Sequence, residues 1–159
     1  MELLAPYSYS DGQGVAWDVP KGTKVDGASI PKPLWGAIGG PFEGKYRNAS
    51  VIHDHFCVTK TRYWEATHRV LYEAMLANGV EKKLAQLMFY TVYRFGPRWE
   101  SDFSLNHSGD NAPTEYFANY DQAELDRVAE AISKGVVPLS ELLAQAKEKR
   151  VQTDKRSRP

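Results

Sequence analysis

Three of the four histidines and the only cysteine of the chain lie close together, between Ser50 and Met75. At helical spacing, His53 shares a face with Cys57, one turn later, and His68 belongs to a second apolar stripe that begins at Trp64. Both imidazoles are therefore predicted to point inward. Imidazole nitrogens near a thiol or a carboxylate can transfer protons or bind a metal ion, so this stretch is the candidate for chemistry.

Two helices must position these side chains. The apolar periodicity predicts one helix that carries His53 and a second that carries His68, joined by the short link Thr59–Arg62. Short helix-to-helix connections favour antiparallel neighbours whose inward faces meet, so we expect the two imidazoles to converge. Asp54 lies at the border of the first stripe and Glu65 at the edge of the second. Both carboxylates are therefore expected near the same cleft.

The rest of the chain predicts a small α+β protein. Residues 15–19 and 23–25 alternate apolar and polar positions around a Pro-Lys-Gly turn, which predicts a β-hairpin. A third, broadly apolar helix runs from Val80 to Phe95. Residues 98–120 are rich in Ser, Asn, Asp, Gly and Pro and predict a loop.

Two further helices are expected after Asp121, which begins a capping box, and after Ser140. The predicted fold is a small N-terminal antiparallel β-hairpin or sheet packed on a bundle of three central helices, followed by two C-terminal helices. We expect one α+β domain over residues 1–135, a short C-terminal helix over 136–150, and a disordered basic tail over 151–159.

Composition excludes several classes of protein. The 159 residues contain 20 basic and 20 acidic side chains, and this zero formal charge argues against a domain that grips nucleic acid through its phosphates. The single cysteine cannot form an internal disulfide, which favours a reducing, cytoplasmic location. No signal peptide or transmembrane segment is expected from the sequence. The sequence does not identify a partner, and it argues against nucleic acid.

Two loop segments precede the first histidine helix. Gly36, Gly39 and Gly40 form a cluster at its entrance, and such a cluster can cradle an anion or offer carbonyl oxygens to a cation. The segment Asp-Gly-Ala-Ser-Ile-Pro places Asp26 and Ser29 in an ordered loop. These two residues can either cap a turn or take part in the site.

Four short motifs resemble the phage- and prophage-associated domain of unknown function 1353 family over roughly residues 15–96. They are Val19–Gly22, the DGASIP segment at 26–31, Ile52–Asp54 and Tyr72–Leu76. The resemblance implies a phage or prophage setting and points to Asp26, Ser29, His53 and Asp54. Where the family is expected to have Ala-Asp in its second helix, this chain has Thr67–His68.

A weaker similarity is to the His-Asp helix core of phospholipases A2. It implies that His53 acts as a general base on water, that Asp54 and the loop Gly36–Gly40 hold calcium, and that Glu65 or His68 orients the base. The disulfides of that family are absent here.

The sequence leaves three functions open. The first is a hydrolase in which His53 is the general base and Asp54 binds a cation or orients the imidazole. The second is a zinc site formed by His53, His68 and a carboxylate from Asp54 or Glu65. In the third, the histidines are structural and the protein is a phage morphogenesis or host-interaction factor, which leaves open a phage or host protein as its partner. Possible cofactors are therefore calcium or zinc, and Cys57 is either a ligand, a nucleophile or a core residue.

Overall fold

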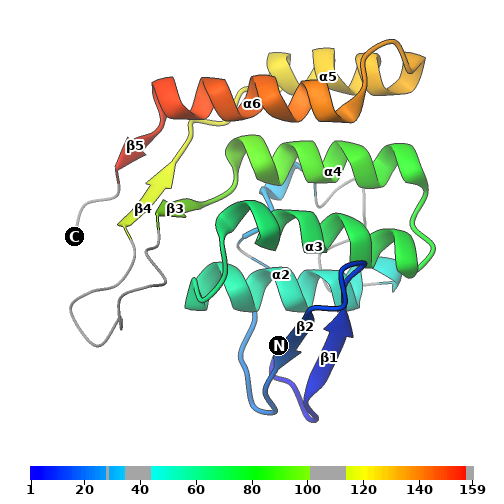
Figure 1. Cartoon of the computed structure of the whole chain (residues 1–159), viewed down its shortest axis with the longest axis vertical. Helices are drawn as coiled ribbons and strands as arrows, with labels where there is room; N and C mark the ends of the chain where they lie inside the picture. Colours follow the sequence, from blue (N-terminus) through cyan, green and yellow to red (C-terminus); the bar gives the residue numbers. More distant parts are fainter. Residues whose placement is uncertain (28, 35–43, 101–113, 157–159) are drawn as a thin grey trace.

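The computed structural model describes residues 1–27, 29–34, 44–100 and 114–156. Its elements lie in successive layers, with the N-terminal hairpin against the first of three stacked helices and a pair of C-terminal helices on the opposite side (Figure 1). The α+β class predicted from the sequence is confirmed.

Three central helices form the middle of the molecule: α2 (Arg47–Thr59), α3 (Trp64–Ala77) and α4 (Lys82–Phe95). Helix α3 contacts both α2 and α4, so it is the inner helix of the three. Helix α4 lies between α3 and the C-terminal pair of helices. Short 3-10 turns, η1 (Lys32–Leu34) and η2 (Gly44–Tyr46), precede α2.

The link between α2 and α3 is short, as expected. Lys60 ends α2 in a left-handed backbone conformation, with φ of 53°, and its amide donates to the carbonyl oxygen of Phe56. This reversal turns the chain back so that α3 packs along α2. The buried side chains Ile52, Leu71 and Met75 belong to the resulting hydrophobic core. The histidine helices are therefore held by apolar packing along their shared face.

The N-terminal sheet is a two-stranded antiparallel hairpin of β1 (Tyr7–Ser10) and β2 (Ala16–Val19). Trp17 and Val19 are buried while their neighbours in β2 are exposed, which is the alternation that predicted this strand. The predicted partner of β2 was wrong. The segment 23–25 runs beside residues 1–3 instead, with a bridge between Lys24 and Glu2, while β2 pairs with the strand that precedes it.

A second antiparallel sheet has the order β3-β4-β5, with β3 (Arg98–Glu100), β4 (Thr114–Phe117) and β5 (Lys155–Arg156). The composition predicts a loop over 98–120, and this prediction is wrong for residues 98–100 and 114–117, which are strands. It also predicts a disordered tail over 151–159, whereas α6 extends to Thr153 and β5 pairs with β4. Residues 101–113 and 157–159 lie outside the described part of the chain.

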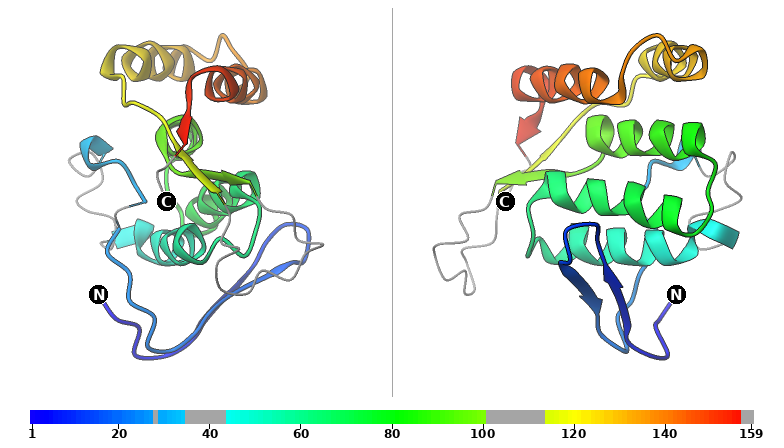
Figure 2. Two further views of the ribbon diagram at one scale, coloured as in Figure 1. Left: turned by 90° about the vertical axis from the view of Figure 1, so that its left-hand side faces the viewer. Right: turned by 45° about the vertical axis from the view of Figure 1, so that its right-hand side comes forward.

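The C-terminal helices α5 (Gln122–Lys134) and α6 (Leu139–Thr153) lie side by side over α4 (Figure 2). Asp121 caps α5, because its side chain accepts a hydrogen bond from the amide of Glu124. The Glu124 side chain does not complete the capping box. It accepts instead from Tyr90 and Arg94 of α4, which ties α5 to the central helices.

None of the helices in the described residues is both long and apolar enough to cross a bilayer.

Candidate functional site

The imidazoles of His53 on α2 and His68 on α3 meet inside the helix pair. The Nε2 atom of His53 lies 2.7 Å from the Nδ1 atom of His68. The other nitrogen of His68, Nε2, lies 2.8 Å from the carbonyl oxygen of Pro97, just after α4. The other nitrogen of His53, Nδ1, lies 3.1 Å from the hydroxyl oxygen of Ser29. These four residues therefore form a continuous series of polar contacts, which we call the histidine relay.

The partners of the relay determine which ring nitrogens carry protons. A carbonyl oxygen only accepts, so Nε2 of His68 must be the protonated nitrogen that donates to Pro97. Nδ1 of the neutral His68 ring is then an acceptor, and Nε2 of His53 must donate to it. The same reasoning leaves Nδ1 of His53 with a free lone pair that faces the Ser29 hydroxyl.

Burial keeps both imidazoles neutral. His53 and His68 are each 0% exposed. Burial lowers the pKa of His53 to about 3, because removal from water penalises the charged ring. Burial also lowers the pKa of His68 well below its ordinary value, and the neighbouring His53 adds to this effect. A neutral ring with a free Nδ1 can accept a proton from a reacting group at neutral pH.

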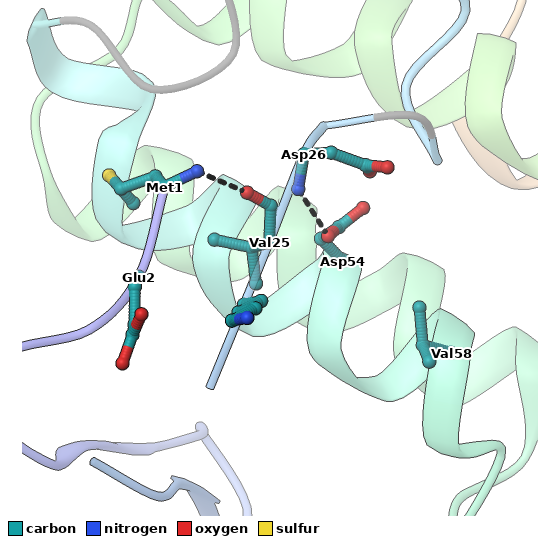
Figure 3. A pocket seen from close by; sticks show the side chains of 7 residues that line it. Met1, Glu2, Val25, Asp26, Asp54 and Val58 are labelled. Atoms are coloured by element: carbon teal, nitrogen blue, oxygen red, sulfur yellow. Dashed lines mark hydrogen bonds between the residues drawn. The ribbon is translucent and has the colours of Figure 1, made fainter. Parts of the chain in front are cut away.

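Asp54 lies beside the relay and anchors the loop that carries Ser29. One carboxylate oxygen accepts a hydrogen bond from the backbone amide of Asp26 at 3.1 Å (Figure 3). The other accepts from the Ser29 hydroxyl, also at 3.1 Å. Asp54 is only 2% exposed, so these contacts are made largely out of water. Asp26 and Ser29, which the resemblance pointed to, therefore lie in direct contact with the His53–Asp54 dipeptide.

An open cavity of about 450 Å³ reaches this site. Ser29, Asp54 and Cys57 lie on its wall, while the two imidazoles lie behind them. The remaining lining residues combine charged groups with apolar ones: Asp26, Val58, Lys60, Phe95, Gly96, Pro97, Glu115 and Phe117. A small molecule or an extended chain segment can therefore reach the Ser29 hydroxyl, which lies between the cavity and the buried ring of His53.

Cys57 completes a second grouping around the same histidines. Its sulfur lies 3.6 Å from Nε2 of His53, and Cys57 Sγ, His53 Nε2 and His68 Nδ1 all lie within 4.8 Å of one another. Burial raises the pKa of the Cys57 thiol, and the charge of Asp54 adds to that rise. Within the described part of the chain, the potential metal ligands that lie this close together are therefore one sulfur and two nitrogens.

Among the remaining predicted site residues, Glu65 lies away from the relay. The Glu65 carboxylate accepts from the Tyr93 hydroxyl at 3.4 Å and pairs with Lys147 of α6 at 3.1 Å, so it belongs to the contact between α3 and α6. The glycine cluster at 36, 39 and 40 lies outside the described residues, as does His107. The described residues therefore bring together Asp26, Ser29, His53, Asp54 and His68.

Pro97 is the site residue that sequence reasoning missed. Its contribution is a backbone carbonyl, which every residue has, so no residue type marks it. The available signal was positional. Gly96-Pro97 follows the end of α4, which packs against α3, and a backbone carbonyl that has left a helix must find its partner elsewhere.

The chain matches the family described as "Protein of unknown function (DUF1353)" over residues 1–92. Two relatives come from Sinorhizobium fredii. "Uncharacterized protein y4jT" is 47% identical over 115 residues, which cover 72% of this chain and 34% of that protein. "Uncharacterized protein y4iH" is 53% identical over 97 residues, which cover 61% of this chain and 41% of that protein.

The aligned part of this chain thus spans only about a third to two fifths of the length of these curated relatives. No solved structure matches the chain significantly. Because the family match covers more than half of the residues and includes the HD dipeptide and the DGASIP segment, the chain belongs to the DUF1353 family.

Proposed function

We propose that this protein is a hydrolase that cleaves an ester or amide bond, with His53 as the general base and the Ser29 hydroxyl as the attacking group. One observation carries the proposal. The relay from Ser29 through His53 and His68 to the Pro97 carbonyl is unbroken, and its Ser29 end lies on the wall of the cavity. A nucleophile, a base and a group that orients the base are the parts that acyl transfer requires.

His68 has the role of the orienting group in this proposal. Its Nδ1 accepts the proton of His53 Nε2, which keeps the lone pair of His53 on Nδ1. The Pro97 carbonyl in turn fixes the orientation of the His68 ring. Because both rings are fully buried, water does not compete for these hydrogen bonds.

The proposed reaction begins when the Ser29 oxygen attacks the carbonyl carbon of the substrate and its proton passes to His53 Nδ1. The bond to the leaving group then breaks, and the leaving group takes that proton. Water subsequently attacks the acyl group on Ser29, again losing a proton to His53. Bond cleavage returns the proton to Ser29 and releases the acid.

Asp54 has an orienting role rather than a cation-binding role in this scheme. Both of its carboxylate oxygens already accept hydrogen bonds, one from the Asp26 amide and one from Ser29. Since Ser29 has a single hydroxyl proton, Asp54 and His53 compete for it in the resting protein. Substrate binding that turns the hydroxyl toward His53 would begin the reaction. Calcium dependence, which the sequence also suggested, is tested by adding calcium or a chelator to the same assay.

The proposal is tested with a fluorophosphonate probe, which reacts covalently with an activated serine, and with p-nitrophenyl esters of increasing chain length. We expect the probe to label Ser29, as located by peptide mass spectrometry. Ser29→Ala should abolish labelling, and His53→Gln should lower labelling and ester cleavage by about 10²- to 10⁴-fold, the usual contribution of a general base.

His55→Ala is the matched control, because His55 lies on the same helix but faces away from the relay, toward Phe56. Circular dichroism establishes that each variant is folded. If cleavage survives in Ser29→Ala but is lost in His53→Gln, the attacking group is water and not Ser29. If both folded variants retain cleavage, the hydrolase proposal is wrong.

The phage or prophage setting stays a prediction of the resemblance. A non-enzymatic role in phage assembly or host interaction would apply if folded His53→Gln and His68→Asn variants lost a protein partner and the unaltered chain cleaved no substrate.

A further inference from the structure

We propose that Cys57, His53 and His68 form a binding site for a zinc ion, and that zinc bound there switches off the histidine relay. Metal binding by this cysteine-containing set is independent of the hydrolase proposal, whereas the inhibitory consequence rests on it. The three ligand atoms lie within 4.8 Å of one another, and all three side chains are buried.

The spacing of the sulfur and nitrogen atoms suits zinc. Bonds of about 2.3 Å to sulfur and 2.0–2.1 Å to nitrogen place a sulfur and a nitrogen about 3.6 Å apart in a tetrahedral site, and two nitrogens about 3.3 Å apart. The separation between Cys57 Sγ and His53 Nε2 is 3.6 Å. The two histidine nitrogens are 2.7 Å apart, a hydrogen-bond distance, so zinc must separate them by roughly 0.6 Å.

The residues around the three ligands also suit a zinc site. His53 and Cys57 lie one turn apart on α2, and His68 faces them from α3, so rigid helices hold all three. A metal-bound histidine usually donates its second ring N–H to a carbonyl, and Nε2 of His68 already faces the Pro97 oxygen. Cys57 also lies on the cavity wall, which gives the ion a route inward and supplies water for the fourth position.

The hydrogen bonds at Ser29 give an independent reason for this site. With the lone pair of His53 on Nδ1, the single Ser29 proton must serve both His53 and Asp54, each 3.1 Å away. Zinc on Nε2 of a neutral imidazole moves the ring proton to Nδ1. His53 can then donate to Ser29 while Ser29 donates to Asp54, and both contacts become full hydrogen bonds.

The same proton shift removes the general base. A protonated Nδ1 cannot accept the Ser29 proton, so the zinc-bound protein cannot begin the proposed reaction. The proton balance is simple, because the ring proton of His53 moves within the ring and the Cys57 thiol releases one proton to solvent. Zinc binding should therefore release about one proton per ion.

The test uses the full chain after chelator treatment and dialysis. Cobalt(II) is added first as a spectroscopic substitute for zinc, and we expect a sulfur-to-cobalt charge-transfer band in the near ultraviolet at one ion per chain. Calorimetric zinc titrations in buffers of different ionisation enthalpy then give the number of protons released. Cys57→Ser and Cys57→Ala should lose the band and bind zinc at least about 100-fold more weakly. Loss of a residue that only hydrogen-bonds to a metal ligand costs at most about 100-fold in affinity, so a larger loss identifies Cys57 as a direct ligand.

His55→Ala is the matched control and should bind like the unaltered chain. Zinc should inhibit ester cleavage by the unaltered chain but not by Cys57→Ser. Equal zinc affinity of folded Cys57→Ser and the unaltered chain would overturn the site. If zinc binds but ester cleavage continues at the same rate, the proposed inhibition is wrong and the zinc site itself stands. If the chain cleaves no ester, the cobalt and zinc titrations still decide whether the metal site exists.

Discussion

The Nε2 atom of His68 lies 2.8 Å from the carbonyl oxygen of Pro97, and this single contact determines the protonation pattern of both buried histidines. The carbonyl requires a proton on that nitrogen, and the 2.7 Å contact between the rings then requires a proton on Nε2 of His53. A backbone atom at the end of α4 thereby sets the lone pair that faces Ser29.

This pattern predicts the tautomers directly. In chelator-treated protein at neutral pH, ¹⁵N chemical shifts of the imidazole nitrogens should identify both His53 and His68 as neutral rings protonated at Nε2. Adding one equivalent of zinc should move the His53 proton to Nδ1, whereas His55 should not change. A zinc-free His53 protonated at Nδ1 would contradict the assignment.

Gly96 should control the position of the Pro97 carbonyl. A Cβ atom at Gly96 would lie 2.4 Å from the Val92 carbonyl oxygen, closer than any tolerated contact, so Gly96→Ala must displace the backbone next to Pro97. We expect ester cleavage to fall by about 10²-fold, the cost of a misplaced catalytic group. Stability should fall by about 1–3 kcal/mol from overpacking.

Gly12→Ala is the control for this substitution, because a Cβ at Gly12 meets nothing within 4 Å. Rates and urea melts of the two alanine variants are compared. Full activity in a folded Gly96→Ala protein would show that the carbonyl contact does not position the relay.

Substitutions at His68 should separate its hydrogen bond with His53 from its packing. An asparagine places an oxygen near the position of Nδ1 that can accept from His53, although no atom replaces Nε2 at Pro97, so His68→Asn should retain more activity than His68→Leu. Leucine leaves the buried Nε2–H of His53 without an acceptor, which costs about 1–3 kcal/mol. Rates and chemical denaturation of both variants test this ranking. If His68→Leu were more active than His68→Asn, the hydrogen bond that His68 accepts from His53 would not contribute to the reaction.

Glu65 should be dispensable for cleavage. Its carboxylate forms a partly exposed ion pair with Lys147, and such pairs contribute only about 0–1 kcal/mol. Glu65→Gln should therefore change the rate little and lower the free energy of unfolding by no more than this. Asp54→Asn should reduce the rate much more, because it alters the group that holds both Ser29 and the Asp26 amide. A large rate loss in Glu65→Gln would instead indicate that Glu65 orients the general base.

The buried imidazoles predict an acid-sensitive fold. The pKa of His53 is about 3 in the folded protein and 6.5 in an exposed chain, so the unfolded state binds more protons between these values. The stabilisation is complete above pH 6.5 and is lost as the pH falls toward 3. One such histidine contributes a slope of at most about 1.4 kcal/mol per pH unit.

The measurement is the free energy of unfolding of metal-free protein by urea, across this pH range. His53→Gln should show a shallower slope, since glutamine does not titrate. An identical slope would mean that His53 is already protonated in the folded state.

Helical periodicity was sufficient to predict α2, α3, α4 and the meeting of the two histidines, because these helices bury continuous apolar stripes. It was insufficient for the second sheet. Strands β3 and β5 contain three and two residues, too few to show alternation, and they pair with a distant partner. Such pairing depends on tertiary contacts that local composition does not report.

Helix geometry also explains what could be inferred about the neighbours of His53. Cys57, four residues later, lies directly along the same face and comes within reach of the ring nitrogen. Asp54, one residue later, points about 100° away and meets the DGASIP loop instead. The sequence named both residues, but only the folded loop determines that Asp54 holds Ser29.

The wall of the cavity is formed partly by residues inside the family match and partly by residues beyond it. Ser29, His53, Cys57 and His68 all lie within the family match at residues 1–92, whereas Glu115 and Phe117 on β4 lie beyond it. The family match therefore includes the loop and the two helices that carry these four residues, whereas the β4 side of the opening is formed by residues outside the matched segment.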